Sequence, residues 1–265
     1  MANSTSGESV IHRVVRILSA FGDDSPSLSL RELAREVGLP VSTAHRLVAE
    51  LELEGLLVRD ESGRLRHGHH LWELASRGSR ASSLREAALT PMEDLLNQTG
   101  NHVSLGVVEG TDVLYLERLA TDDAAVNITK IAGRLPIHGC SAGLVYMAYA
   151  PAEEQELFLR RRLEKLTEDT VTEPDKLRGI LADIRKNGFL SVAGIIVPES
   201  AGISVPIFAN EGKVVAMLSL IVGRGEENLQ ATVPQLQFAS RAISRRLGYE
   251  PAGRSVRRRS LQISL

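Results

Sequence analysis

The sequence predicts a protein of mixed α and β structure, with a helix-rich N-terminal block that ends in a short β-hairpin and a longer C-terminal α+β block. Apolar residues recur at helical spacing in three short stretches before residue 54. Two short apolar runs separated by a Gly-containing turn follow at 56–66. Beyond residue 100, strand-like runs mix with helical stretches, which is typical of a sheet with helices on its faces.

The composition is that of an ordinary globular protein, because 43% of the 265 residues are apolar and 24% are charged. This excludes a disordered or collagen-like chain, and the length allows one large domain or two smaller ones. One cysteine, Cys140, excludes an intrachain disulfide framework and a CxxC zinc site, and it fits a reducing cytoplasm. The N-terminus lacks the features of a signal peptide and no apolar run is long enough to span a membrane, so we expect a cytoplasmic protein with no membrane partner.

The net charge of −2 neither requires nor excludes nucleic acid as a partner. The distribution of charge is more informative, since residues 1–80 contain ten Arg and no Lys. The planar guanidinium group is well suited to phosphate and to guanine edges. Four Arg between Arg254 and Arg259 predict a solvated, disordered basic tail.

The first helical stretch has a wide apolar face, with core-facing positions at Val10, Val14, Ile17, Leu18 and Phe21. Ile11 and Val15 widen this face on one side. The width indicates either a deeply buried helix or a contact with a second chain. The Gly-Asp-Asp-Ser-Pro run at 22–26 ends the stretch.

Two short helices joined by a tight turn come next, which is the helix-turn-helix pattern. Ser29 and Glu32 have the spacing of a capping box, and Gly38 is expected just after the end of that helix. The second helix follows Pro40 and has its buried positions at Ala44, Leu47, Val48 and Leu51. The residues that it would present to base edges, as a recognition helix does, are Ser42, Thr43, His45 and Arg46.

A β-hairpin is predicted after this helix, with strands at 56–58 and 64–66 and a turn at 60–63. Such a hairpin is the wing of a winged helix-turn-helix. Leu65 is expected to point inward, while Arg64 and Arg66 point outward and reach phosphate or the minor groove.

Each of these features alone is more often structural, but their combination is specific. The segments 29–40, 42–47 and 52–59 together resemble the IclR family of bacterial transcriptional regulators, and the resemblance extends to about residue 249. It implies DNA-binding dimers or tetramers and a GAF-like effector-binding domain in the C-terminal block. Val41 stands where the family usually has Lys, which removes one phosphate contact.

We therefore predict four segments along the chain. They are a winged helix-turn-helix DNA-binding domain at 1–67, a linker helix at 68–80, a GAF-like effector-binding domain at 81–249 and a basic tail at 250–265. The linker is expected to hinge near Gly78. Capping boxes begin at Ser83 and Thr90, and Pro91 is expected at the first position of a helix.

Strands and helices mix in the C-terminal block. Strands are predicted at 102–108, 112–119, 190–197, 202–208 and 213–222, with a weaker one at 125–129. Helices are predicted at 141–150, 152–163, 173–187 and 229–247. The first two strands form a hairpin, because only 109–111 separate them.

The Gly-rich stretch 134–143 leads into a helix and is the candidate ligand site, since backbone N–H groups at a helix N-terminus hold anions. It matches the family's motif beside the ligand pocket. The predicted effector-binding residues are His138, Gly139, Cys140, Ser141, Gly202, Ser204 and Ser219. His138 and Cys140 also allow an alternative, a nucleophile and its base, although a Cys two residues after a His on a turn rarely has the required geometry.

Several polar anchors of the family are missing around this site, and Val192 to Ile195 replace its acidic residues. Burying a polar ligand group without a partner costs a few kcal/mol. We therefore expect either an amphipathic ligand with one polar or anionic end and an apolar body, or no ligand at all. No metal cluster or cofactor site is predicted, and His67, His69 and His70 fit a solvated junction better than a metal site.

The sequence thus predicts a transcriptional regulator that is not an enzyme, with double-stranded promoter DNA, a small-molecule effector and further copies of itself as partners. Two alternatives remain, an enzyme that uses His138 and Cys140 and a ligand-free oligomeric scaffold. The outward face from Ser42 to Arg46 favours the regulator, because an enzyme has no use for it. The effector, the operator and the sign of regulation stay open.

Overall fold

The computed structural model describes residues 8–22, 25–77, 79–120 and 131–250. The chain divides into two compact units between Ser79 and Arg80, and each unit is described by itself. Three predicted features lie outside the described residues: the weak strand at 125–129, the hinge residue Gly78 and nearly all of the basic tail.

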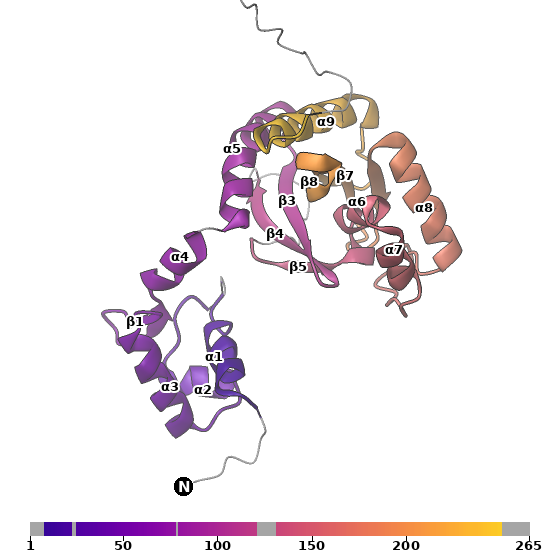
Figure 1. Cartoon of the computed structure of the whole chain (residues 1–265). Helices are drawn as coiled ribbons and strands as arrows, with labels where there is room; N and C mark the ends of the chain where they lie inside the picture. Colours follow the sequence, from indigo (N-terminus) through magenta and orange to yellow (C-terminus); the bar gives the residue numbers. More distant parts are fainter. Residues whose placement is uncertain (1–7, 23–24, 78, 121–130, 251–265) are drawn as a thin grey trace, which may run out of the picture. The chain divides into compact units, whose positions relative to one another are not determined.

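The first unit has the predicted helix-turn-helix and hairpin (Figure 1). Its elements are α1 (Val10–Leu18), α2 (Leu30–Glu36), α3 (Val41–Leu53), β1 (Leu57–Arg59), β2 (Leu65–His67) and α4 (His69–Ser76). The two strands are antiparallel, and each begins one residue later than predicted. An isolated bridge between Leu28 and Leu65 joins the hairpin to the segment before α2.

Local sequence signals set the bounds of α2 and α3. Ser29 caps α2, its side chain accepting from the backbone N–H of Glu32 while the Glu32 carboxylate accepts from that of Ser29. Gly38 then adopts a φ of +59°, a left-handed conformation that favours glycine and ends the helix. Pro40 begins α3 two residues later, so the turn between the two helices is tight.

The core of the first unit lies between α1, α2, α3 and the hairpin. Its fully buried side chains are Ile17, Leu33, Leu47, Leu57 and Leu65. Val10 was expected in this core but is 47% exposed. Val10 lies about 10 Å along the α1 axis from the buried Ile17, so the first turn of α1 extends beyond the core.

The second unit is a six-stranded antiparallel sheet in the order β5-β4-β3-β8-β7-β6. The strands are β3 (His102–Glu109), β4 (Asp112–Leu119), β5 (Arg134–Pro136), β6 (Leu190–Ala193), β7 (Ser200–Phe208) and β8 (Val214–Gly223). The helices are α5 (Arg80–Thr99), α6 (Ser141–Tyr149), α7 (Ala152–Leu159), α8 (Pro174–Asn187) and α9 (Leu229–Arg246). Among the described helices, none combines the length and apolar composition that a membrane crossing requires.

Helices cover both faces of this sheet, as the sequence predicted (Figure 1). Helices α5 and α9 lie side by side on one face, and α6, α7 and α8 lie on the other. Alternation along β8 divides its side chains between the two cores, since Leu218 packs toward α5 and α9 while Met217 packs toward α6 and α8.

The helix that precedes the sheet differs from the prediction. Thr90 and Pro91 do not begin a new helix, because α5 runs without a break from Arg80 to Thr99 and contains Pro91. A proline leaves the carbonyl four residues earlier without its helical partner. That carbonyl belongs to Ala87, and the Arg246 guanidinium of α9 donates to it over 3.0 Å.

The strands and helices around the candidate ligand site also differ in their bounds. The strand expected at 190–197 ends at Ala193, because Gly194 adopts a φ of +74° and turns the chain into an irregular segment. The helix expected at 152–163 ends at Leu159. The short strand β5 was not predicted, and it pairs with β4 at the sheet edge.

Candidate nucleic-acid interface and ligand pocket

Helix α3 presents a polar face at its N-terminal end. It buries the four predicted residues Ala44, Leu47, Val48 and Leu51. Ser42, His45 and Arg46 are consequently exposed, and Thr43 is half-buried. Arg46 pairs with Glu50 one turn later, with 3.0 Å between Nη1 and Oε1 and both side chains more than half exposed. Such a helical pair contributes only about 0.3–0.5 kcal/mol, so Arg46 is free to exchange Glu50 for another partner.

The two arginines of the hairpin differ. Arg66 is exposed and forms no ion pair or side-chain hydrogen bond with the described residues. Arg64 is half-buried, and its Nη2 lies 2.8 Å from Glu32 Oε2 and 2.9 Å from the Ser27 carbonyl oxygen. The expectation that Arg64 points outward like Arg66 is therefore not met, because Arg64 ties the hairpin to the start of α2.

Glu32 joins this contact to the helix cap. The pKa of Glu32 lies below its ordinary value, chiefly because its carboxylate accepts a hydrogen bond from the Ser29 backbone N–H. The Ser29 side chain and the Arg64 guanidinium lower the pKa further. Glu32 therefore stays ionised at neutral pH and connects α2, its capping residue and the hairpin.

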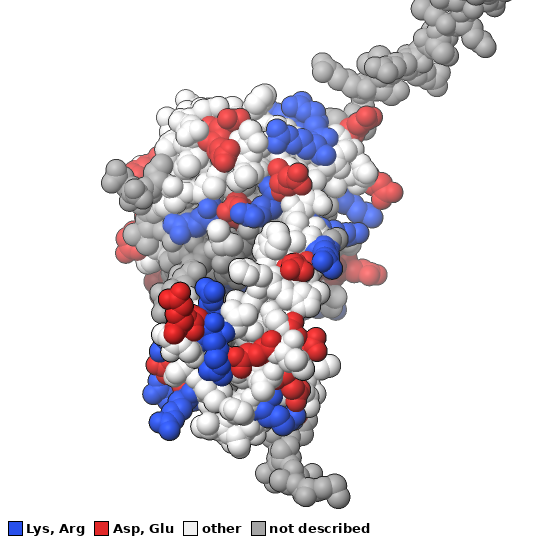
Figure 2. Space-filling view, turned by 90° about the vertical axis from the view of Figure 1, so that its left-hand side faces the viewer, with Lys and Arg blue, Asp and Glu red and all other residues white. Residues whose placement is uncertain are grey.

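Acidic and basic side chains alternate over much of the face shown in Figure 2. This agrees with the 31 Lys and Arg against 33 Asp and Glu of the whole chain. If that face attracts a polyanion, the attraction would consequently come from individual arginines and not from a broad positive electrostatic potential.

A pocket in the second unit opens beside the 134–143 stretch and has an empty volume of about 430 Å³, which includes the part open to solvent. Four predicted residues line it: Gly139, Cys140, Ser141 and Gly202. The pocket also has an apolar wall, formed by Val192, Ile195, Ile196 and Val197.

The other two predicted serines lie behind the pocket surface. Ser204 of β7 and Ser219 of β8 face each other across neighbouring strands, with 2.7 Å between their hydroxyl oxygens. Ser204 Oγ also lies 2.6 Å from Ser141 Oγ. All three serines are buried, so Ser204 and Ser219 reach the pocket only through Ser141.

His138 and Cys140 are held apart by different partners. His138 Nε2 lies 2.8 Å from the Glu164 carbonyl oxygen, and no hydrogen bond joins these two side chains, both of which are described. Burial raises the pKa of the Cys140 thiol to about 11, although a hydrogen bond with Tyr115 acts in the opposite direction. A protonated thiol without a base is a poor nucleophile, so the geometry gives no support to the enzyme alternative.

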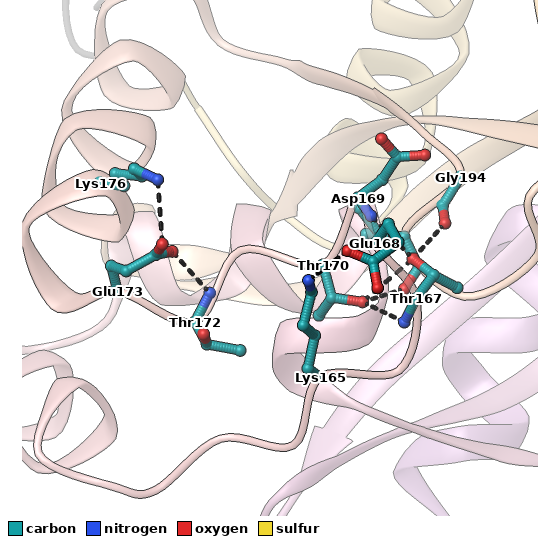
Figure 3. A network of polar contacts seen from close by, with 10 residues as sticks. Lys165, Thr167, Glu168, Asp169, Thr170, Thr172, Glu173, Lys176 and Gly194 are labelled. Atoms are coloured by element: carbon teal, nitrogen blue, oxygen red, sulfur yellow. Dashed lines mark hydrogen bonds and ion pairs between the residues drawn. The ribbon is translucent and has the colours of Figure 1, made fainter.

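Hydrogen bonds join the loop at 167–170 to the backbone of the segment that forms the apolar wall (Figure 3). The hydroxyl of Thr167 donates to the Gly194 carbonyl oxygen over 2.6 Å, and that of Thr170 donates to the Ile195 carbonyl oxygen over 2.8 Å. Arg224 at the end of β8 pairs with Asp169 of the same loop, and it also donates to the Pro198 carbonyl oxygen. The loop at 167–170 therefore holds the segment that closes the pocket.

Sequence reasoning missed Tyr115 and the way in which the 194–197 segment lines the pocket. Tyr115 is buried in β4 beside Cys140. An aromatic residue with a hydroxyl group, at an inward position of a strand, needs a buried polar partner, and this was the available signal.

The histidines near the end of the hairpin serve structural contacts. His67 Nε2 lies 2.8 Å from the Leu18 carbonyl oxygen, and His70 Nδ1 lies 2.7 Å from that of Glu54. Within the described ranges, no group of three or more His, Cys, Asp or Glu side chains is arranged to hold a metal ion.

Comparison with protein families gives two matches. The family model described as the C-terminal domain of the bacterial transcriptional regulator IclR matches residues 79–245. The family model described as the IclR helix-turn-helix domain matches residues 10–61. Together they include α3 and the pocket-lining residues.

Individual relatives agree with these matches. The chain is 40% identical to an IclR homolog from Microbacterium hydrocarbonoxydans, solved in complex with 4-hydroxybenzoate, with a TM-score of 0.85 over 91% of this chain and 99% of that one. It is 38% identical to an IclR homolog from Microbacterium sp. strain HM58-2, with a TM-score of 0.60 over 92% and 99%. It is 29% identical to the HTH-type transcriptional regulator XynR of Escherichia coli strain K12, over 90% of this chain and 97% of that protein.

Proposed function

Because the chain belongs to the IclR family of bacterial transcriptional regulators, we propose that it binds double-stranded promoter DNA as a homodimer and senses a small amphipathic molecule. The exposed polar face at the start of α3 carries the proposal. A regulator of this kind acts on DNA in the cytoplasm.

The DNA-reading residues in this proposal are those that α3 exposes. Ser42, Thr43, His45 and Arg46 lie within the first turns of α3, which is where a recognition helix meets base edges in the major groove. Arg46 is the base-reading group, because a guanidinium bonds the O6 and N7 atoms of guanine in a bidentate manner. Arg66 of the hairpin contacts the phosphate backbone, and Arg64 supports the hairpin that carries Arg66.

The effector site in this proposal is the pocket of the second unit. Gly139, Cys140, Ser141 and Gly202 supply its polar end, and the wall from Val192 to Val197 packs against the apolar body of the ligand. The 4-hydroxybenzoate bound by the Microbacterium relative is a molecule of this amphipathic kind. His138 supports the site through its bond to the 164 carbonyl, and Ser204 and Ser219 support Ser141.

The dimer contact in this proposal is the outer face of α1. Val10, Ile11 and Val15 are exposed there, at 47%, 76% and 55%. A second copy would bury these side chains, and a two-fold axis would place two α3 helices on two half-sites. The effector then acts by binding one arrangement of the dimer more tightly than another, and the two arrangements differ in the spacing of the two DNA-binding units.

Substitution of Arg46 tests the reading face. Against an operator selected from random DNA by the wild-type protein, Arg46→Ala should weaken binding by about 1–3 kcal/mol and relax the preference for one base pair. Arg66→Ala should weaken binding to all DNA sequences alike. It should also reduce the slope of log affinity against log salt concentration by about one unit. Fluorescence anisotropy titrations at several salt concentrations measure both effects.

Arg161→Ala is the matched control, since Arg161 is exposed in the second unit and should leave operator affinity unchanged. An Arg46→Ala protein that keeps the affinity and base preference of the wild type would show that α3 is not the reading helix.

A further inference from the structure

The pocket ends on a chain of three buried hydroxyl groups that crosses into the sheet. Ser141 is at the N-terminus of α6, Ser204 is in the middle of β7 and Ser219 is opposite it in β8. The oxygen–oxygen distances along this chain are 2.6 and 2.7 Å. Each is the length of a good O–H···O hydrogen bond.

The Ser141 hydroxyl lies at the pocket surface. Both Ser141 and Gly202 line the pocket. A Cβ atom added to Gly202 would lie only 2.7 Å from Ser141 Oγ, so the absence of a side chain there leaves room above this hydroxyl. Any larger residue at 202 would cover the polar end of the pocket.

The three hydroxyls can turn together. Each serine has one proton to donate and can also accept. If Ser219 donates to Ser204 and Ser204 donates to Ser141, the Ser141 proton points to the pocket. If all three protons point the other way, the Ser219 proton points toward the side of the buried Ser104, its pair in β3, and Ser141 offers a lone pair to the pocket instead. The chain therefore suits a ligand group that both donates and accepts.

The described residues that line the pocket carry no charge. They are Tyr, Leu, Ile, Val, Ser, Gly and Cys140, and the thiol of Cys140 stays protonated. Arg224 and Asp169, which hold the wall, pair with each other. A carboxylate at this end of the pocket would consequently lose its hydration without gaining a cationic side chain as partner, and only the backbone N–H groups at the start of α6 would offset that loss.

We propose that Ser141, Ser204 and Ser219 form a relay whose Ser141 end binds an uncharged hydroxyl group of the effector. The pocket then selects hydroxylated apolar molecules over their deoxy analogues and over the corresponding carboxylates. This proposal rests on the effector-binding function proposed above. Ser141 contacts the ligand, whereas Ser204 and Ser219 are positioning residues.

Three probes of similar size and shape test the relay: p-cresol, toluene and p-toluate. Calorimetric titration of the full chain should show p-cresol binding about tenfold more tightly than toluene or p-toluate, the effect of one well-placed hydrogen bond. Ser141→Ala should bring the ratio of p-cresol to toluene affinity close to one, mainly by weakening p-cresol. Ser204→Ala should lower the ratio about threefold, because Ser141 loses its partner inside the protein.

Ser200→Ala is the matched control. Ser200 lines the pocket, but its hydroxyl donates to the Val197 carbonyl oxygen and is not part of the relay. The ratio of p-cresol to toluene affinity of the Ser200→Ala protein should equal that of the wild type. Because toluene and p-cresol respond alike to a general disturbance of the pocket, a changed ratio reports the hydroxyl contact itself.

Three results would overturn the relay: p-toluate binding as tightly as p-cresol, an unchanged ratio in Ser141→Ala, or no binding of any probe. The regulatory function is tested separately, by adding p-cresol to the protein bound to its operator. If p-cresol binds with a preference that depends on Ser141 but does not alter operator affinity, the relay stands and the sensing function fails.

Discussion

Arg64 and Arg66 stand two positions apart in one hairpin, yet their surroundings differ. Alternation along the strand predicts that Leu65 is buried, and it is fully buried. Alternation does not show that Glu32, 32 residues earlier, lies next to Arg64. That contact depends on how the hairpin sits against α2, which no local pattern fixes.

The Glu32–Arg64 contact should make the stability of the first unit depend on pH. Glu32 has a pKa below its ordinary value of 4.5, so its carboxylate stabilises the fold above that pH and loses this effect as pH falls through the folded pKa. Glu32→Gln and Arg64→Ala should both lower the melting temperature at pH 7. The deficit of Glu32→Gln should shrink as pH falls below 4.5 and through the folded pKa of Glu32.

Differential scanning calorimetry of the full chain measures these changes, with Arg66→Ala as the control that should melt like the wild type. An equal deficit for Glu32→Gln at both ends of the pH range would mean that its charge does not stabilise the unit.

The pocket shows which lining residues can be predicted from residue types alone. The 134–143 stretch and Gly202 were predicted as lining, and Gly139 to Ser141 and Gly202 do line the pocket. Ser204 and Ser219 were predicted on the same grounds but lie behind it, because Ser141 covers them. Sequence identifies polar residues on the correct face of a strand, whereas their depth depends on the helix packed above.

At the scale of elements, α5 shows a distant contact that overrides a local signal. Thr90, Pro91 and Glu93 form a pattern that usually begins a helix, but α5 continues through it. Arg246, 159 positions after Ala87, donates to the Ala87 carbonyl that Pro91 leaves without a partner. Pairing between α5 and α9 is a property of the fold, so the local pattern could not show it.

A double-mutant cycle tests this compensation. Arg246→Ala should lower the free energy of unfolding by about 0.5–1.5 kcal/mol, the contribution of a typical hydrogen bond. Pro91→Ala restores a backbone N–H that bonds the Ala87 carbonyl, so Arg246→Ala should cost close to nothing in that background. Urea denaturation gives the four free energies.

Arg245→Ala serves as the control in this cycle, because Arg245 also lies in the last turn of α9 and shares its favourable interaction with the helix dipole. Equal losses from Arg246→Ala with and without Pro91 would show that the two residues are not coupled.

At the scale of the whole molecule, hairpins were predictable and the sheet order was not. Short loops make β3 and β4 neighbours, and the period-2 pattern assigns their faces. The pairing of β3 with β8 joins strands more than 90 residues apart, and β8 thereby becomes a central strand. Apolar patterns do not specify which buried strand lies next to which.

The exposed face of α1 leads to the prediction for the assembly. Ile11→Glu combined with Val15→Glu should convert a dimer into a monomer at micromolar concentration, because two charges per chain would have to be buried in the contact. The same protein should bind a two-half-site operator weakly and without cooperativity. Sedimentation velocity measures the first effect and a gel-shift titration the second.

Leu157→Glu is the companion control, since Leu157 is an exposed apolar residue of α7 in the second unit, and this variant should remain dimeric. A wild-type chain that sediments as a monomer with and without DNA would rule out the dimer.

Cys140 makes this chain convenient for distance measurements. It is the only cysteine, it is buried, and its thiol stays protonated. A new cysteine at Glu61, in the exposed turn of the hairpin, would therefore be the one thiol that a maleimide spin label reaches in the folded protein. Two copies in a dimer would then carry two labels, and pulsed electron paramagnetic resonance would measure the spacing of the two hairpins before and after a ligand is added.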